Sequence, residues 1–180
     1  SSGSSRSVSR LEFSRVLMKQ LLGVLAIVLS LAGAGCRQVD LATALNVTDV
    51  FTGWYHMGVV DGLNKLVPSF TFRLENVGDR SVNRVQLLVS FWQNGADGEI
   101  DSKQVTGIGP EDLPPSGSTD PLLVRSDFGY TLEQSEQELF QHTYFRDFTA
   151  KLFARSGGRL VPLGEFPIER RIIPRVTSQP

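Results

Sequence analysis

The chain has 180 residues, of which 41% are hydrophobic, and this is enough for one domain with a core beside an N-terminal segment. Four basic residues and one acidic residue precede Cys36, so the rest of the chain carries 14 basic and 18 acidic side chains and offers no electrostatic footprint for nucleic acid. Cys36 is the only cysteine, which excludes an intramolecular disulfide bond and a zinc site built on cysteines.

Residues 1–36 combine a basic arm with an apolar run. The arm holds Arg6, Arg10, Arg15 and Lys19, and no charged residue stands between positions 21 and 35. A helix over residues 16–36 would have about the length that crosses a hydrocarbon core, and the basic flank predicts an N-terminus in the cytoplasm. A secretory signal has the same layout. Either way, we expect residues 37–180 on the periplasmic or outer side of the cytoplasmic membrane.

The end of the apolar run resembles a lipobox. Residues 31–36 read LAGAGC, and bacterial lipoproteins have small residues before a cysteine that receives a diacylglycerol. The resemblance implies cleavage before Cys36 and lipidation of its thiol, with an outer-membrane location as a further possibility. Gly33 departs from the pattern, because a bulky aliphatic residue usually stands there. A retained membrane helix, or a free Cys36 after a simple secretory signal, stays open.

The first half of the outer portion predicts strands and turns. We expect a strand from Ala44 with an end or bulge at Gly53, and an exposed excursion with a turn at Asp61-Gly62. Alternating side chains then predict strands over 69–76 and 82–92, joined as a hairpin.

The second half predicts a weak strand over 99–106, a Gly- and Pro-rich loop from 107, and a short strand from 121. A capping box of Thr131 and Gln134 predicts one short helix over 131–141. Strands follow over 145–155 and 159–173, joined by a tight turn, and Pro162 and Pro167 mark the last one as an edge or bulged strand.

The sequence FRLENVGDRSVNRVQLLVSF, followed by LPPSGSTDPLLV, resembles the immunoglobulin-like sandwich domains of many bacterial exported proteins of unknown function. The resemblance implies a mainly β fold, an antiparallel sandwich of about seven strands with one short helix over 44–174. Residues 37–43 are then a linker and 175–180 a polar tail. This architecture hosts many unrelated roles, so it predicts no activity.

Candidate chemistry is sparse. His56 and His142 are the only histidines, and neither has a partner at a metal-ligand spacing. A triad of His142, Asp147 and Ser126 lacks a nucleophile turn. Asp97, Glu99 and Asp101 offer oxygens at two-residue spacing for calcium, although a solvated turn explains them as well. We therefore expect no catalytic site, no metal site and no cofactor.

Apolar segments point instead to a partner surface. Aromatic and Met side chains with few charges are typical of interface cores. The candidate contacts are Trp54, Tyr55, Met57, Val59, Val60, Phe128 and Tyr130. The alternative for Trp54 is that it closes the end of the core.

We expect a non-enzymatic accessory or scaffolding subunit that contacts membrane lipid and other subunits of a membrane complex, for example a respiratory, transport or photosynthetic one. The alternative is a lipoprotein that binds a ligand or carbohydrate through the end loops of the sandwich, with Trp54, Tyr55 and Trp92 offering rings for stacking.

Overall fold

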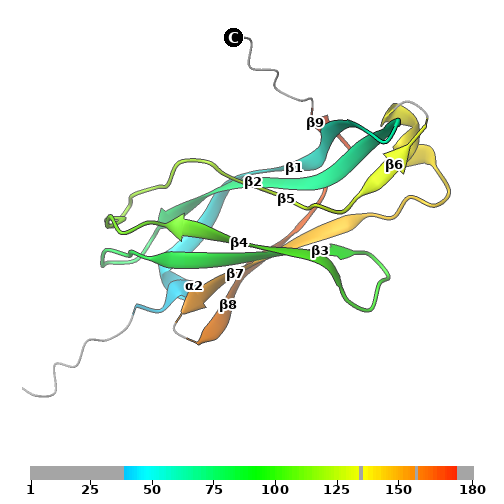
Figure 1. Cartoon of the computed structure of the whole chain (residues 1–180). Helices are drawn as coiled ribbons and strands as arrows, with labels where there is room; N and C mark the ends of the chain where they lie inside the picture. The colour runs from blue at the N-terminus through cyan, green and yellow to red at the C-terminus, as the bar shows by residue number, and fades with distance from the viewer. Residues whose placement is uncertain (1–38, 134–135, 157, 174–180) are drawn as a thin grey trace, which may run out of the picture. The chain divides into compact units, whose positions relative to one another are not determined.

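The computed structural model describes residues 39–133, 136–156 and 158–173, which form a mainly β structure (Figure 1). The elements in chain order are α2 (Leu41–Ala44), β1 (Leu45–Val60), β2 (Leu63–Asn76), β3 (Val85–Gln93), β4 (Glu99–Ile108), β5 (Leu122–Arg125), β6 (Tyr130–Leu132), the 3₁₀ helix η1 (Glu136–Gln141), β7 (Phe148–Ser156), β8 (Arg159–Pro167) and β9 (Ile172–Ile173).

One sheet is built around a long hairpin of β1 and β2. Its strand order is β5-β2-β1-β9, and β6 also pairs with β2. Asp61 and Gly62 connect the two long strands with φ angles of 52° and 83°, the left-handed backbone that a tight two-residue hairpin turn requires. The predicted turn is confirmed. Residues 53–60, expected as a strand end and an exposed excursion, instead continue β1 as far as this turn.

The other sheet has the order β4-β3-β7-β8, and its pairings are antiparallel. Pro162 and Pro167 lie in β8, an edge strand with a register irregularity opposite Leu152 and Phe153. Proline fits there because an edge strand can lose an N–H donor without breaking a second ladder. The edge assignment from sequence is confirmed.

The hairpin predicted between residues 69–76 and 82–92 is wrong. β2 pairs with β1, whereas β3 pairs with β4 and β7 in the other sheet. Both strands have alternating apolar residues because both face the same core, and alternation alone does not say which neighbour a strand pairs with. Between them, Val82 bridges Leu113 and Arg84 has a φ of 51°, as the chain passes from one sheet to the other.

The helix predicted over 131–141 is correct only for the second half of this range. Tyr130–Leu132 is a strand paired with residues 64–66 of β2, and among the described residues of the range, 136–141 are helical, in the tighter 3₁₀ form. Gln134, the proposed capping partner of Thr131, lies outside the described residues. The start of β2 offers an open edge at this point, and pairing with it takes precedence over local helix propensity.

One hydrophobic core lies between the two sheets and takes side chains from both. Leu41 and Ala44 of α2 belong to it, so packing begins inside the segment 37–43 that was expected to be a linker. Asp40 caps α2 by accepting a hydrogen bond from the backbone N–H of Ala42 at 3.1 Å. The core therefore fixes the point at which the chain enters the domain.

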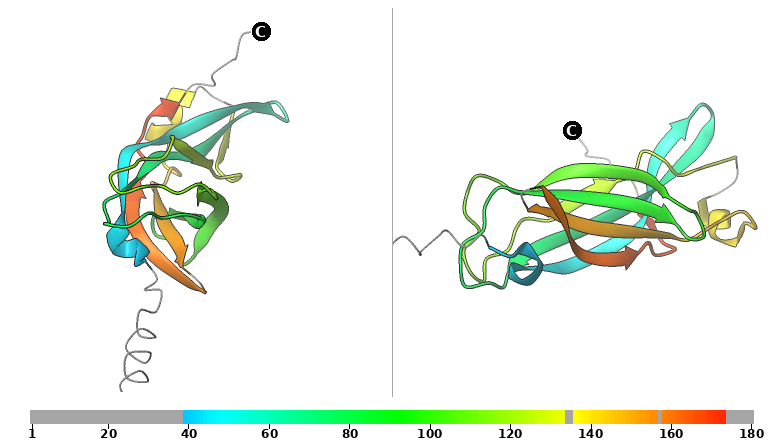
Figure 2. Two further views of the ribbon diagram at one scale, coloured as in Figure 1. Left: turned by 90° about the vertical axis from the view of Figure 1, so that its left-hand side faces the viewer. Right: turned by 90° about the horizontal axis from the view of Figure 1, so that it is seen from below.

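The domain is elongated, with α2 at one end and the β1–β2 turn, β6 and η1 at the other (Figures 1 and 2). The 16 residues of β1 run along this length. At roughly 3.3 Å per residue, the strand spans about 50 Å. The apolar segment that ends β1 thus lies far from the point where the chain enters.

Candidate functional site

The end of the domain opposite α2 is organised by a cluster of aromatic rings around Trp54. Trp54 is fully buried, and its ring lies 5.4 Å from Tyr130, 5.4 Å from Phe145 and 5.3 Å from Phe148, measured between ring centroids. Phe140 of η1 adds a further ring at 6.5 Å. Trp54 therefore closes the core, as the alternative interpretation held, and is not available on the surface of this chain.

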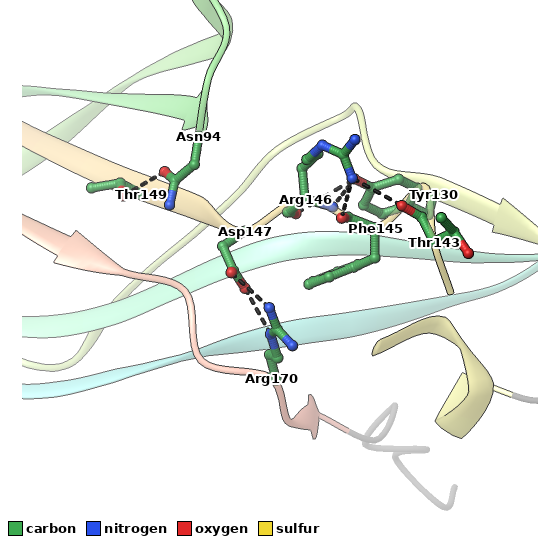
Figure 3. Close-up of polar contacts among 8 residues, drawn as sticks. All are labelled: Asn94, Tyr130, Thr143, Phe145, Arg146, Asp147, Thr149 and Arg170. Atoms are coloured by element: carbon green, nitrogen blue, oxygen red, sulfur yellow. Dashed lines mark hydrogen bonds and ion pairs between the residues drawn. The ribbon is translucent and has the colours of Figure 1, made fainter. Parts of the chain in front are cut away.

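Polar contacts hold the segment after η1 against this cluster (Figure 3). The Tyr130 hydroxyl accepts a hydrogen bond from the backbone N–H of Arg146 at 2.9 Å. The Arg146 guanidinium donates to the carbonyl oxygens of Thr143 at 3.0 Å and Phe145 at 2.9 Å. These bonds give the irregular segment a fixed path across the end of the domain.

An ion pair joins the start of β7 to the segment before β9. Arg170 donates two hydrogen bonds to the Asp147 carboxylate, at 2.8 and 2.7 Å (Figure 3). This bidentate pairing holds the pKa of Asp147 below its usual value. The Arg170 guanidinium also lies 5.1 Å from the centre of the Phe145 ring. Asp147 is thus engaged with Arg170 and does not serve a histidine.

The tip of the β1–β2 hairpin carries three of the expected contact residues. Met57 is 40% exposed, Val59 66% and Val60 42%. The register of β1 against β2 shifts between His56 and Gly58, which places Met57 in a bulge. β9 pairs with β1 only at Trp54 and Tyr55, so the described partners of β1 beyond that point lie on the β2 side alone. The hairpin tip, residues 57–60, is thus an apolar segment with exposed side chains, and among the described residues no second strand pairs with it on the side away from β2.

The other expected contacts are more enclosed or lie elsewhere. Tyr55 is half-buried, with the Arg125 guanidinium 3.7 Å from its ring centre. Tyr130 is half-buried in the aromatic cluster. Phe128 is 58% exposed, but it lies in the β5–β6 loop rather than on the hairpin. The structure therefore gathers only Met57, Val59 and Val60 into one exposed apolar segment.

A pocket of about 390 Å³ opens beside the aromatic cluster. Its apolar and aromatic lining comes from the start of β2, from β6, and from η1 with the segment that follows it: Leu63, Tyr130, Leu132, Leu139, Tyr144 and Phe145. Its polar lining is Thr131, Glu133 and His142. Sequence analysis did not predict this pocket. The signal in the sequence is the density of aromatic residues between Leu139 and Phe145, the first part of which the capping pattern predicts as helix.

His142 lies at the pocket with Tyr144. The Nδ1 atom of His142 accepts a hydrogen bond from the backbone N–H of Tyr144 at 3.3 Å, and the two ring centroids are 5.4 Å apart. In a neutral imidazole, this bond leaves Nε2 as the donor. Tyr144 is 77% exposed. The two rings, tilted by 34° to each other, therefore form a solvent-facing rim of the pocket.

The carboxylate of Asp101 ties the β4 edge to the β5–β6 loop. It accepts hydrogen bonds at 2.8 Å from the Ser126 hydroxyl and from the backbone N–H of Asp127, and its side chain is 3.3 Å from the Lys103 ammonium. Burial raises the pKa of Asp101, but the hydrogen bonds from Asp127, Ser126 and Lys103 outweigh this effect and lower it.

The contacts of Asp101 bear on two hypotheses from the sequence, the catalytic triad and the calcium site. Ser126 bonds to Asp101 and Asp147 bonds to Arg170, so the proposed triad with His142 does not assemble. The oxygens of Asp101 are used within the cluster, and no group of three or more His, Cys, Asp or Glu residues in the described part of the chain could hold a metal ion.

Cys36 and the apolar run before it lie outside the described residues. Among residues 39–133, 136–156 and 158–173, the structure contains no helix that is long and apolar enough to cross a membrane.

Comparison with known proteins gives little beyond this. No protein-family model matches the chain, and no curated protein matches it. A similar solved structure is the X-ray structure of Northeast Structural Genomics Consortium target SoR45. It is 13% identical, with a TM-score of 0.44, and the match covers 72% of this chain and 89% of that one.

Proposed function

We propose that this chain is a non-enzymatic, membrane-anchored domain that acts as an accessory or scaffolding subunit of a larger membrane protein complex. Residues 1–36 supply the anchor, either as a retained helix or through a lipid on Cys36. The domain lies on the periplasmic side of the cytoplasmic membrane, or at the outer membrane if Cys36 is lipidated. We further propose an immunoglobulin-like topology, which is supported by the crossing from β2 to β3 between sheets and by the return of β9 to β1.

The observation that carries this proposal is the exposed hairpin tip. Met57, Val59 and Val60 are apolar, and each is 40% or more exposed. They extend an open strand edge, which natural proteins usually protect with charges or prolines. None of residues 57–60 is charged or a proline. Such an edge is a favourable surface for a protein partner.

The position of this tip supports a protein rather than a lipid partner. The described part of the chain begins at Val39, directly before Asp40, the N-cap of α2, and the tip lies at the other end of the domain, about 50 Å along β1 at roughly 3.3 Å per residue. A domain that the chain enters at the α2 end, with an apolar contact at the far end, suits a subunit that reaches a neighbouring protein projecting from the membrane.

Extraction from the native membrane tests the proposal. After mild detergent treatment, the chain should co-migrate with a larger complex on a native gel and on a sizing column. Recovery as a lone monomer under conditions that keep other complexes intact would refute it.

A matched pair of variants tests the role of the tip. Val60 and Val50 both lie in β1 and are both 42% exposed, but only Val60 is at the tip. We expect Val60→Ser to reduce recovery of the complex by about tenfold, because a buried valine contributes roughly 1.5 kcal/mol at an interface. Val50→Ser should leave recovery unchanged. Equal losses in both variants would point to stability instead of contact.

A ligand-binding role is the second candidate, and the pocket beside β6 favours it. Carbohydrate stacking is less well supported. Trp54 is buried, and the Lys151 ammonium lies 4.6 Å from the centre of the Trp92 ring. The chemistry of the pocket itself gives a more specific ligand class.

A further inference from the structure

We infer that the pocket between β6, η1 and the start of β2 binds a small organic cation with an apolar body, such as a ring-bearing or alkylated amine. None of residues 57–60 lines this pocket, although Leu63, the cross-strand partner of Val60, does, and the inference does not depend on the proposed docking role.

The walls of the pocket are built before any ligand arrives. The Tyr130 and Phe145 rings both pack against Trp54 at 5.4 Å and lie 5.5 Å from each other. The Tyr130 hydroxyl is held by the Arg146 backbone N–H at 2.9 Å. Because these two rings are already held in place, a ligand loses little binding free energy to the conformational entropy of ordering them, and this favours affinity for a small molecule.

The charge of the lining selects a cation. Among the described residues that line the pocket, Glu133 is the one with a charged side chain at neutral pH. The nearby Arg146 guanidinium is engaged by the carbonyl oxygens of Thr143 and Phe145 (Figure 3). Arg170 is engaged by Asp147. Among the described residues that form the pocket, one carboxylate thus stands without a lining Lys or Arg to balance it.

The rings of the lining suit the same ligand. Tyr130, Tyr144 and Phe145 all border the pocket. Aromatic faces attract ammonium groups through their quadrupole, and a ring with a carboxylate nearby is a recurrent way to hold an alkylated amine. Phe145 already accepts one cation in this way, since Arg170 lies 5.1 Å from its ring centre.

The size of the pocket limits the ligand. Its volume of about 390 Å³ is at the small end of the usual range for ligand sites, about 300–1,000 Å³. Leu63, Leu132 and Leu139 supply an apolar surface for the body of the molecule. A single ring with a short charged substituent fits this description better than a lipid chain or an oligosaccharide.

Fluorescence of the full-length chain tests the inference. The chain has two tryptophans, so Trp92→Phe leaves Trp54 as the only tryptophan, 5.4 Å from the Tyr130 ring of the pocket wall. This variant is titrated with benzyltrimethylammonium, with the neutral benzyl alcohol and with benzoate, and calorimetry provides a second readout. We expect saturable binding of the cation, about tenfold weaker binding of the alcohol, and no binding of benzoate.

Variants connect the binding to the pocket. Glu133→Gln and Tyr144→Ala should each weaken binding of the cation by about five- to tenfold. Both side chains are exposed, so far-UV circular dichroism should stay unchanged. Glu111→Gln, which removes an exposed carboxylate in the β4–β5 loop, is the matched control and should bind as before.

Three outcomes would overturn the inference: no saturable binding of the cation, equal binding of the three probes, or binding that neither pocket variant changes. None of these outcomes changes the expected result of the co-migration test, so either proposal can be refuted while the other stands.

Discussion

Replacement of Trp54 by alanine tests whether this residue serves the core or a partner surface. Trp54 is fully buried and contacts four aromatic rings, those of Tyr130, Phe140, Phe145 and Phe148. Burial of about 200 Å² of tryptophan surface at about 25 cal/mol per Å² corresponds to roughly 5 kcal/mol. Measured losses for Trp→Ala in cores are about 3–5 kcal/mol, so we expect a loss of about 4 kcal/mol for Trp54→Ala.

The Trp54 indole N–H makes Trp54→Phe less destabilising than the loss of ring size alone would predict. The indole N–H of Trp54 is buried and has no hydrogen-bond partner among the described residues. An unsatisfied buried donor costs about 1–3 kcal/mol, and phenylalanine would remove it while keeping a ring. We therefore expect Trp54→Phe to lose clearly less stability than Trp54→Ala.

Urea unfolding followed by far-UV circular dichroism measures both losses, since the amide backbone gives most of this signal and the midpoint can be compared between variants. For a domain of this size, a loss of 4 kcal/mol corresponds to a fall in Tm of roughly 10–15 °C. A loss below about 1 kcal/mol for Trp54→Ala, together with weakened recovery of a complex, would refute the core assignment.

Two further changes test how the sheets are held. A Cβ at Gly53 would lie 2.8 Å from Cγ of Arg171 and 3.0 Å from the Arg171 carbonyl oxygen, so Gly53→Ala should displace β9 and lower the free energy of unfolding by about 2 kcal/mol. The substitution should also speed amide exchange at Trp54, because the Trp54 N–H bonds to that carbonyl oxygen at 2.8 Å. Gly98→Ala is the control, because nothing lies within 4 Å of its Cβ position, and equal effects of the two substitutions would contradict the reasoning. The lowered pKa of Asp101 predicts stability that is present above the unfolded pKa, about 3.9, and lost as pH falls through the lower folded value. Asp101→Asn should therefore flatten the fall in Tm between about pH 5 and pH 2, and an unchanged pH profile would exclude this contribution.

Local sequence patterns predicted the elements better than their pairing. The Asp61-Gly62 turn follows from residues that tolerate positive φ, and the edge position of β8 follows from its two prolines. Strand alternation correctly placed Phe70, Phe72 and Leu74 in the core. The same alternation gave β2 the wrong partner, because side-chain periodicity carries no information about which strand lies alongside.

The candidate site was visible from sequence only in part. Met57, Val59 and Val60 stood out as apolar residues beside a turn, and the structure exposes them. Trp54 stood out for the same reason and is buried, since residues distant in sequence, Tyr130, Phe145 and Phe148, enclose it. The choice between core and surface depends on these long-range neighbours.

The sequence by itself determined that the part of the chain after Cys36 is mainly β, that no disulfide bond is possible within the chain, and that a tight turn falls at Asp61-Gly62. These properties depend on composition and on the conformational preferences of neighbouring residues. Only the tertiary structure decided that β2 and β3 belong to different sheets, that residues 130–132 form a strand, and that a pocket opens beside them. Each of these depends on contacts between segments far apart in the chain, where burial and strand pairing outweigh local preference.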